Sequence, residues 1–597
     1  MDRRDGESVS NHTDWCAIRI GPLFMAALAV LFPCLMCHER FSGSDPVAIG
    51  TLVAYCFAVG WTSARIDHTL RVRPYFRNML FLIASLAVST TLIGENLNAQ
   101  WWIIDDHRLL ARLGPDGELS IGETLDVLIS HPEVGKPSLK NERYRPALMV
   151  LTYLETFVCQ DSPFRWYLGR LLIMAASLSL FLNVLWYWVG IPIGSVFIVY
   201  CLTYQFWGDI FCRLYTSEIY ALPGSALFLW GAQNLYRLGR ANREPSRTSY
   251  FSSWTILSLG VCIASGSKEN FLFLLPLVWV LAFWLARKGR LWRASWPFMI
   301  TITLYNVLIA GVVVTGLMAR GVDQYQNSVS PVSRLQLIPY GASAFFSRKE
   351  LISFILFLIV ASRGIWIQRR NRASPNVHHS TRISFLLGTI FFGTFVFNYV
   401  FYNGTIPKGT RYDFPALLMP GLFWLSMYLV AEHVLADLKG RRTVRYLRTG
   451  LVLILGVLTA NRGTESLHRS SHLNVVRTRE FQSRLNLIVT QLKSRPADSA
   501  LLVSHHPYDL ELLGSVEFFL RRAGVTNDLF VRYAGPGAES FERTLFKDLI
   551  ESIKSLSLKG HLKIHPLGDL PKGDTVWAIG ISGETHNETE TLLVRLY

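Results

Sequence analysis

Residues 168–188 read LGRLLIMAASLSLFLNVLWYW and contain a single charged side chain, Arg170. A helix that crosses the hydrocarbon core of a bilayer needs about 20 consecutive, mostly apolar residues. This stretch is therefore typical of a transmembrane helix. Runs of the same character recur along the chain and predict about thirteen transmembrane helices, at 18–37, 46–63, 78–95, 168–188, 190–208, 218–236, 252–267, 270–286, 296–318, 350–363, 383–402, 415–434 and 450–461.

The composition of the whole chain supports the same fold class. Of its 597 residues, 50% are hydrophobic and 17% are charged, against roughly a quarter charged in soluble globular domains. A soluble protein of this length could not bury so much apolar surface, so an ordinary cytosolic enzyme and a disordered chain are both excluded. The sequence predicts a polytopic α-helical membrane protein with room for one small soluble domain.

The basic residues predict the orientation of these helices. The formal net charge is +16, and we attribute it to loops rather than to nucleic-acid binding. Alternate loops at 64–77, 237–250, 287–293, 363–382 and 439–448 hold 22 Lys and Arg, whereas the short loops on the other side hold 9. Cytoplasmic loops carry the excess of Lys and Arg. The N-terminus is therefore expected in the cytoplasm, with the loop 96–166 and the C-terminal segment outside. If 450–461 does not cross, the C-terminal segment would lie in the cytoplasm instead.

Three domains are expected. Residues 1–77 form an extra N-terminal transmembrane hairpin, and residues 78–461 form the main membrane domain with the long loop 96–166. Residues 462–597 have ordinary charge and an α/β rhythm, which predicts a small extracytoplasmic α/β domain. Its expected strands are 499–504, 528–533 and 575–581, and its expected helices are 509–522 and 541–556.

An acidic motif in the loop 96–166 is the first candidate for chemistry. Asp105, Asp106 and His107 follow Trp101-Trp102, a pair typical of the membrane interface. Two adjacent carboxylates raise one pKa, which suits Asp105 or Asp106 as a general base. The pair could also hold a divalent cation, Mg or Mn. The alternative is the acidic first turn of a solvated helix, with His107 either beside a substrate or purely structural.

Other polar residues are expected on the same face of the membrane. They are Arg145, Glu218, the Lys268-Glu269 turn and Arg411-Tyr412. Arg145 and Arg411 suit anion binding, or else anchor their helices at the head groups. Lys268 runs against the positive-inside bias, which favours a role, although a Lys–Glu pair in a turn is the simpler reading. Glu218 could equally be an acid that complements a helix dipole.

In their order and sidedness, these motifs resemble the GT-C superfamily of membrane glycosyltransferases. Tyr144-Arg145-Pro146-Ala147-Leu148 is similar to the family's Y/F-R-P-L element, and Arg411-Tyr412 is similar to its R-Y element before a proline. Glu218 and Ser267-Lys268-Glu269 resemble elements of transmembrane O-mannosyltransferases that carry tetratricopeptide repeats. The resemblance covers about residues 78–434. The chain departs from those relatives in its two extra N-terminal helices and its α/β domain, and in outline it resembles aminoarabinose-transferase type proteins.

The resemblance implies transfer of a sugar from a polyprenyl phosphate to an extracytoplasmic glycan, lipid or protein hydroxyl, with inversion. Asp105 or Asp106 would be the base. Arg145, Lys268 and Arg411 would face the leaving phosphate, with His107, Glu218, Glu269 and Tyr412 also at the substrates. The expected location is a bacterial inner membrane, and no nucleic-acid partner is expected. A flippase or transporter of lipid-linked sugars and a non-catalytic membrane assembly protein remain as alternatives, although the charge-poor helix interiors count against a transporter.

Overall fold

The computed structural model describes residues 74–103, 105–113, 117–131, 133–134, 144–240, 246–287, 292–320, 334–346, 375–439, 467–496, 499–504, 510–527, 529–533, 564–565, 576–586 and 589–596. The helices predicted at 18–37, 46–63, 350–363, 450–461 and 541–556 lie outside these residues, as does the predicted hairpin 1–77 up to residue 73.

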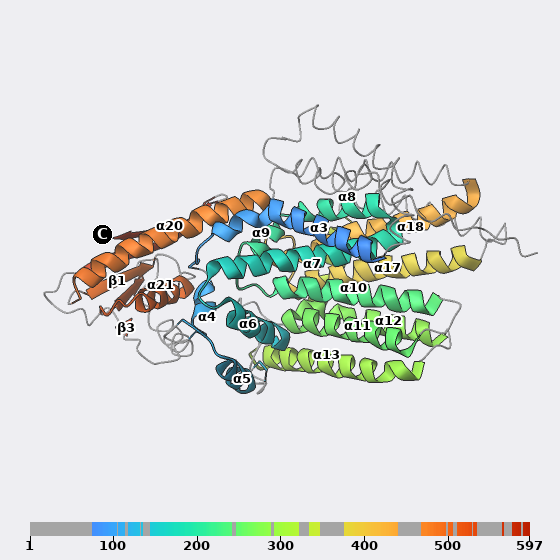
Figure 1. Cartoon of the computed structure of the whole chain (residues 1–597), viewed down its shortest axis with the longest axis horizontal. Coiled ribbons are helices and arrows are strands. Elements are labelled where there is room, and N and C mark those ends of the chain that lie inside the picture. Colours follow the sequence, from blue (N-terminus) through green and yellow to red (C-terminus); the bar gives the residue numbers. More distant parts are fainter. Residues whose placement is uncertain are drawn as a thin grey trace, which may run out of the picture.

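The described part is mostly helical, and long helices run side by side through most of its volume (Figure 1). They are α3 (Pro74–Ile93), α7 (Pro163–Val189), α10 (Glu218–Arg240), α11 (Arg247–Ser267), α12 (Leu274–Arg287), α13 (Trp292–Arg320), α17 (Pro375–Phe401) and α18 (Met419–Lys439). Among the described residues, five helical stretches are long and apolar enough to cross a membrane: Tyr75–Asn98, Pro163–Val189, Glu269–Arg287, Arg293–Gly316 and Ser384–Phe401.

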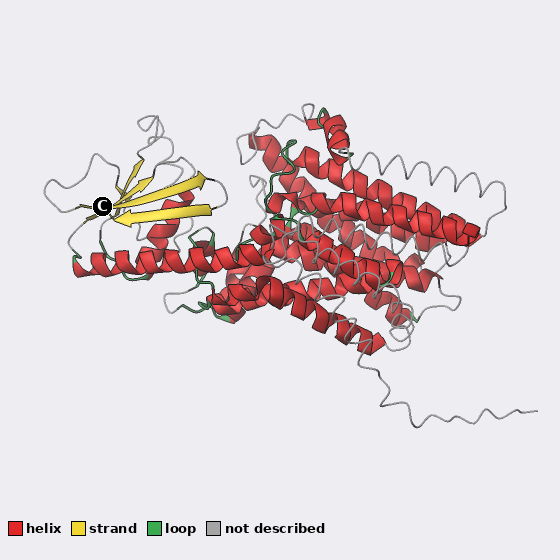
Figure 2. Ribbon diagram, turned by 90° about the horizontal axis from the view of Figure 1, so that it is seen from above, coloured by secondary structure: helices red, strands yellow, loops and turns green. Residues whose placement is uncertain are grey.

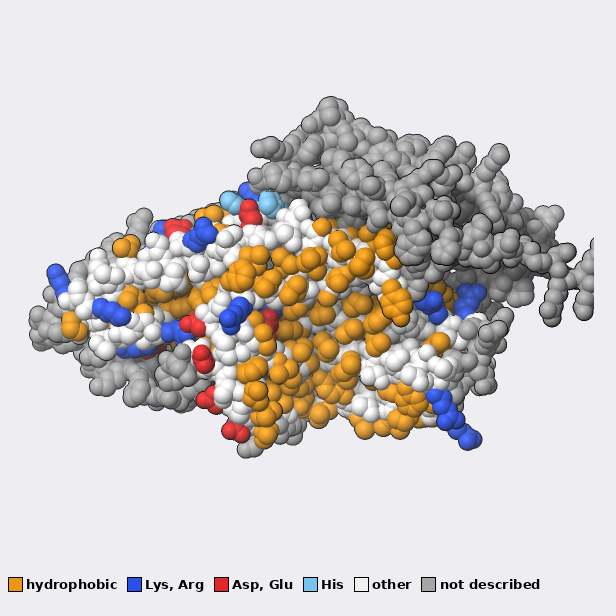
Figure 3. Space-filling view, viewed as in Figure 1, with side chains coloured by type: hydrophobic (Ala, Val, Ile, Leu, Met, Phe, Trp, Pro, Cys, Tyr) orange, Lys and Arg blue, Asp and Glu red, His pale blue; other side chains and the backbone are white. Residues whose placement is uncertain are grey.

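These five stretches coincide with the runs predicted at 78–95, 168–188, 270–286, 296–318 and 383–402. The surface of the bundle agrees with a membrane environment, because hydrophobic side chains dominate the face shown in Figure 3. Exposed apolar side chains on α3 and α13 include Met79, Ile83, Ile300, Leu304 and Val307. A helical membrane protein is thus the observed architecture, and the total of about thirteen spans stays a prediction.

One predicted span is wrong as a single helix. Residues 190–208 form α8 (Ile191–Leu202) and the short α9 (Phe206–Phe211), with a break between them. Twelve residues of α-helix measure about 18 Å, well short of the roughly 30 Å hydrocarbon core. The break is stabilised by polar side chains: Thr203 Oγ1 donates to the Tyr200 carbonyl at 2.7 Å, and Trp207 Nε1 donates to the Cys201 carbonyl at 2.7 Å.

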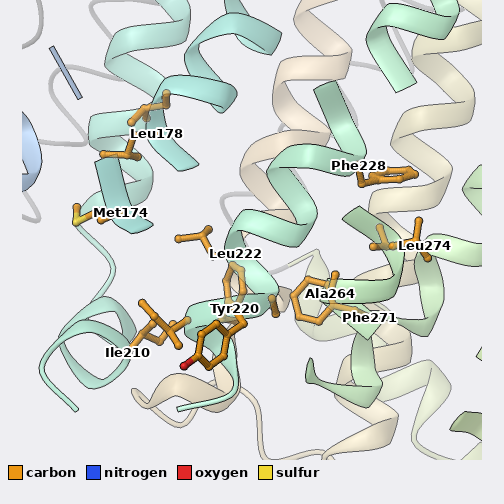
Figure 4. Packing of buried hydrophobic residues seen from close by; sticks show 14 of the residues in the cluster. Met174, Leu178, Ile210, Tyr220, Leu222, Phe228, Ala264, Phe271 and Leu274 are labelled. Atoms are coloured by element: carbon orange, nitrogen blue, oxygen red, sulfur yellow. The ribbon is translucent and has the colours of Figure 1, made fainter. Parts of the chain in front are cut away.

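Helices α10 and α11 approach each other at glycine positions. A Cβ atom built on Gly224 would lie 2.6 Å from the Ala264 nitrogen and 2.9 Å from the Gly260 oxygen. Around this contact, side chains from several helices form one hydrophobic cluster (Figure 4). It includes Met174 of α7, Phe228 of α10 and Leu274 of α12. This packing holds the start of α10 beside the end of α11.

The long loop before α7 folds into short helices at one end of the bundle, which we call the loop end. They are η2 (Gly94–Asn98), α4 (Asp106–Leu110), α5 (Ile121–Ser130) and α6 (Pro146–Cys159). Ser120 starts α5 with a capping box, in which its side chain and that of Glu123 each accept from the other's backbone N–H.

The C-terminal part is a sheet joined to the bundle by one long helix, α20 (Leu467–Ser494) (Figure 2). The sheet order is β3-β2-β1-β4-β5, with β4 and β5 antiparallel and the other neighbours parallel. The elements are β1 (Ser499–Ser504), α21 (Leu510–Arg522), β2 (Leu529–Tyr533), β3 (Ile564–His565), β4 (Val576–His586) and β5 (Thr589–Leu596). Strands β1, β2 and β4 and helix α21 lie at predicted positions.

Short elements complete the described chain near the loop end. The turn after α11 is the 3-10 helix η3 (Glu269–Phe273), and α15 (Ile338–Phe345) packs beside α17. Two further 3-10 turns, η4 (Arg411–Asp413) and η5 (Ala416–Leu418), lead into α18. The turns η3 and η4 carry the polar motifs that the sequence singles out.

Candidate active site

Asp105 lies at the loop end with its carboxylate between two arginines. Its Oδ2 is 3.9 Å from Arg411 Nη1, and its Oδ1 is 3.7 Å from Arg108 Nε. The residue precedes α4 and has a φ of +68°, a left-handed conformation that Asp adopts more readily than most residues. The residue is 8% exposed. Asp105 is therefore an ionisable group held beside a cation from a distant part of the chain.

Asp106 and His107 have a different environment from that of Asp105. Asp106 is 1% exposed, and its Oδ2 accepts the Trp102 N–H at 2.7 Å. Burial raises the pKa of Asp106 to about 8, although the hydrogen bond from Trp102 opposes the shift. His107 is 4% exposed and its ring lies 6.4 Å from that of Phe518 in α21; burial lowers its pKa to about 4. Burial therefore favours the neutral form of both side chains.

Lys268 and Glu218 form a buried ion pair at the junction of α10 and η3. Ser217 Oγ donates a second hydrogen bond to Glu218, at 3.0 Å from Oε2. The Lys268 Nζ also lies 5.5 Å from the ring centre of Tyr412 and 5.6 Å from that of Tyr402. The structure thus brings three predicted residues together: Glu218, Lys268 and Tyr412.

Arg145 and Glu269 form the second ion pair of this group. The Glu269 carboxylate accepts from Arg145 Nε at 2.8 Å and from Nη2 at 2.7 Å, which is the forked geometry of a strong arginine–carboxylate pair. Arg145 directly precedes α6, and Glu269 opens η3. The pair therefore fixes the start of α6 against the turn that carries Lys268.

Arg411 connects these groups electrostatically. Burial alone would lower the pKa of its guanidinium, but the negative charges of Glu218, Asp209 and Asp105 raise it, so Arg411 remains charged. Its Nη1 is buried and has no hydrogen-bond partner among the described residues. A buried donor without a partner costs about 1–3 kcal/mol. A ligand anion would satisfy that donor.

Several residues at this end escaped the sequence prediction. Asp209 Oδ2 accepts the Arg411 N–H at 2.9 Å, and the Asp413 carboxylate accepts the N–H groups of Lys408 and Gly409 at 2.8 and 2.7 Å. Asp413 lies two residues after Arg411, so its position beside the motif is a signal that could have found it. Asp209 offered no such signal, because it follows directly on the mispredicted span 190–208.

A third buried pair supports the start of α10. Arg170 Nη1 lies 2.6 Å from Glu155 Oε1, Tyr220 donates to the same carboxylate, and Arg170 also donates to the Leu214 carbonyl. Arg170 is the single charge in the stretch 168–188, which is the only sequence signal for it. With Tyr220, this pair connects α6, α7 and α10 two residues after Glu218.

Asp105 and Asp106, the two carboxylates that could hold a divalent cation, lie in different surroundings. Asp106 faces the Trp102 N–H while Asp105 faces Arg108 and Arg411, so the two carboxylates have different partners. Within the residues that the structure describes, no group of three or more His, Cys, Asp or Glu side chains could hold a metal ion.

The structure therefore brings together Asp105, Arg145, Glu218, Lys268, Glu269, Arg411 and Tyr412, and places Asp106 and His107 in the packing beneath them. Comparisons of this chain with protein-family models, with curated proteins and with solved structures found no match.

Proposed function

We propose that this protein is a membrane glycosyltransferase that moves a sugar from a polyprenyl phosphate to a hydroxyl of a glycan, lipid or protein. The observation that carries the proposal is the placement of Asp105 within 3.9 Å of the Arg411 guanidinium, at the end of a bundle of apolar helices. The carboxylate and the cation therefore lie close enough for one bound substrate to contact both. The apolar bundle suits a donor with a lipid tail.

The reaction needs a base, and Asp105 fits that role better than Asp106. A general base must be ionised and within reach of the proton it takes. Burial raises the pKa of Asp106 to about 8, and its carboxylate holds the Trp102 N–H, whereas the Asp105 carboxylate lies beside the Arg411 guanidinium. In the proposed step Asp105 takes the proton of the acceptor hydroxyl, and the acceptor oxygen forms a bond to the anomeric carbon.

The bond between that carbon and the phosphate oxygen breaks in the same step, and polyprenyl phosphate leaves. Its charge is stabilised by Arg411, whose Nη1 is an available donor among the described residues, with Lys268 nearby. Arg145 is engaged with Glu269 through two of its nitrogens, which assigns it to positioning the Lys268 turn. A single displacement inverts the anomeric centre, by the geometry that applies to inverting hydrolases.

The proposed setting follows the sequence prediction. The loop end faces the extracytoplasmic side of a bacterial inner membrane, where lipid-linked sugars rather than nucleotide sugars are the accessible donors. The proposed topology has about thirteen spans with a GT-C-like catalytic domain at residues 78–461. The C-terminal α/β domain lies on the same side as the site.

A turnover assay on the purified full-length protein in nanodiscs tests this function. Each of a panel of polyprenyl-phosphate sugars is offered with candidate acceptors, and the release of polyprenyl phosphate is measured. Wild type should release it, Asp105→Asn should not, and Asp126→Asn, which changes an exposed acid on α5, should match wild type. Binding of the lipid without turnover by wild type would instead favour a flippase, and no binding would reject both.

A further inference from the structure

The long helix α20 has a regular buried face that divides into two halves. Its buried positions repeat at intervals of four and three residues, the spacing of a coiled-coil seam. The first half of this face is largely polar and the second half is apolar. The full set is Leu467, Ser471, Asn474, Thr478, Phe481, Leu485, Ile488 and Leu492. A helix of 28 residues is about 42 Å long, so the two halves can serve two different parts of the molecule.

The polar half contacts the chain that leads to Asp105. Asn474 Nδ2 donates to Asn96 Oδ1 at 2.8 Å and lies 3.1 Å from the Tyr167 hydroxyl. Thr478 Oγ1 accepts the Gln100 N–H at 3.0 Å. Asn474 and Thr478 are both fully buried. The bonds to Asn96 and Gln100 each join positions 378 residues apart in the sequence, so they are tertiary contacts and not local structure.

Arg477 lies on the same part of α20 and adds two contacts. Its Nη2 donates to the Cys212 carbonyl at 3.2 Å, and its guanidinium lies 5.0 Å from the ring centre of Trp102. Arg477 Nε also donates to Asn474 Oδ1 at 3.0 Å, which orients the amide of Asn474. Trp102 is the residue whose N–H holds Asp106. The helix therefore reaches the acidic motif through a single intermediate residue.

The apolar half of α20 and helix α21 also contact this segment, at Trp102, Ile103 and His107. The rings of Trp102 and Phe481 meet edge to face at 5.9 Å. Ser515 Oγ donates to the Ile103 carbonyl, and the ring of Phe518 lies beside His107. Trp102, Ile103, Phe481 and Phe519 belong to one buried hydrophobic cluster. Helix α21 contacts both α20 and α4 in this region (Figure 1).

The backbone of Asp105 needs such support. Its φ of +68° is uncommon for a residue other than glycine and persists where the surrounding structure enforces it. We infer that the C-terminal part is a component of the catalytic site: the polar face of α20, through Asn474, Arg477 and Thr478, holds residues 96–106 in the conformation that presents Asp105 to Arg411. These three are positioning residues, because they act through the loop and do not contact the reacting groups.

The expected effect on turnover rests on the proposed function. The expected effect on the order of residues 99–107 does not. Amide hydrogen exchange of the full-length protein in nanodiscs measures the structural part without any substrate. Thr478→Val removes the acceptor of the Gln100 N–H and keeps the shape of the side chain. We expect exchange in residues 99–107 to rise at least about fivefold, the equivalent of one lost hydrogen bond. Thr478→Ser should restore protection, and Asn486→Ala, on the exposed face of the same helix, should leave it unchanged.

The kinetic arm uses the donor and acceptor that wild type turns over. Thr478→Val and Asn474→Ala should lower kcat about 10- to 100-fold with little change in the KM for the donor, because a misplaced group weakens the transition state more than the bound ground state. Unchanged exchange in Thr478→Val overturns the inference, and so does raised exchange with an unchanged kcat. If wild type turns over no donor, the proposed function fails while the exchange result still decides whether α20 orders the loop. If Asn474→Ala does not fold, the results for Thr478→Val decide whether the inference holds.

Discussion

Asp105 and Asp106 are adjacent carboxylates that the fold places in different environments. The first faces two arginines, and the second is buried against the backbone of Trp102. We expect Asp105→Asn to lower kcat about 10²- to 10⁴-fold, the usual contribution of a general base. Asp106→Asn should stay within a few-fold of wild type, because an amide oxygen can accept the same N–H. Steady-state release of polyprenyl phosphate measures both, and equal losses would contradict the assignment.

The buried carboxyl of Asp106 also predicts a pH dependence of stability. Its pKa rises from 3.8 to about 8 on folding, so the folded state binds the proton more tightly than the unfolded state. The stability that this group contributes is fully present below pH 3.8 and is lost as the pH rises through about 8. Between pH 5 and pH 8 the wild type should therefore lose more thermal stability than Asp106→Asn. Differential scanning fluorimetry in detergent follows the two slopes, and parallel slopes would reject the neutral carboxyl.

The pair of Glu155 and Arg170 predicts a large effect of a single substitution. Glu155→Ala leaves the Arg170 guanidinium and the Tyr220 hydroxyl buried without their carboxylate. Breaking a buried ion pair costs about 3–5 kcal/mol, whereas removing both charges costs much less. Thermal unfolding should therefore show a strong loss for Glu155→Ala and a partial recovery for Glu155→Ala with Arg170→Met. A double variant as unstable as the single one would show that the pair itself contributes the stability.

The sequence predicts which types of residue lie in the site better than it predicts the role of each residue. The motifs around Asp105, Lys268 and Arg411 are short and local, and the fold brings them together. The different environments of Asp105 and Asp106 depend on contacts with Arg411 and Trp102, which no local pattern specifies. Asp209 was missed for the same reason, because it meets Arg411 only through the fold.

Among the elements, the contact between α10 and α11 depends on glycine. A side chain at Gly224 would meet the backbone of Ala264 and Gly260, whereas a Cβ on Gly311 in α13 meets nothing within 4 Å. We expect Gly224→Ala to destabilise the protein by about 1–3 kcal/mol through overpacking. Gly311→Ala should be neutral or stabilising by up to about 1 kcal/mol, because alanine favours a helix over glycine. Thermal unfolding and size-exclusion profiles of the two variants make the comparison, and similar profiles would contradict the close contact.

Helix positions were predictable where an apolar run has the length of a membrane crossing. Five such runs coincide with long apolar helices among the described residues. The run 190–208 failed because its average composition is apolar while its break is made by two individual hydrogen bonds, from Thr203 and Trp207. Strands β1 and β2 were predictable from their apolar residues, but β5 was not, since it pairs antiparallel with β4 only in the assembled sheet.

In the whole molecule, the contacts of α20 place the C-terminal domain next to the segment that leads to Asp105. Because α20 packs on the segment 96–102, we expect the C-terminal domain and Asp105 on the same side of the membrane. Helix α11 runs from Arg247 to the turn at Lys268, and its 21 residues span about 32 Å. Its first residues are therefore expected on the opposite side.

Single-cysteine labelling in intact cells tests this arrangement. In a background without the eight native cysteines, Asp126→Cys on α5 and Ser483→Cys on α20 should react equally with an impermeant maleimide. Thr248→Cys at the start of α11 should react only after the membrane is permeabilised. Labelling of Asp126→Cys and Thr248→Cys from one side would contradict the packing of α11 across the bilayer, and labelling of Asp126→Cys and Ser483→Cys from different sides would contradict the contact of α20 with the loop.

The contact between Asn96 and Asn474 also sets an order of events during biosynthesis. A ribosome adds about 5–20 residues per second, so the 378 residues between these two positions take about 20 to 75 seconds to synthesise. Throughout that interval the segment that carries Asp105 has left the ribosome without the helix that holds it. The proposed site is then completed by a part of the chain that is made much later than the acidic motif. A nascent chain or a fragment that stops before α20 carries the acidic motif but not a finished site.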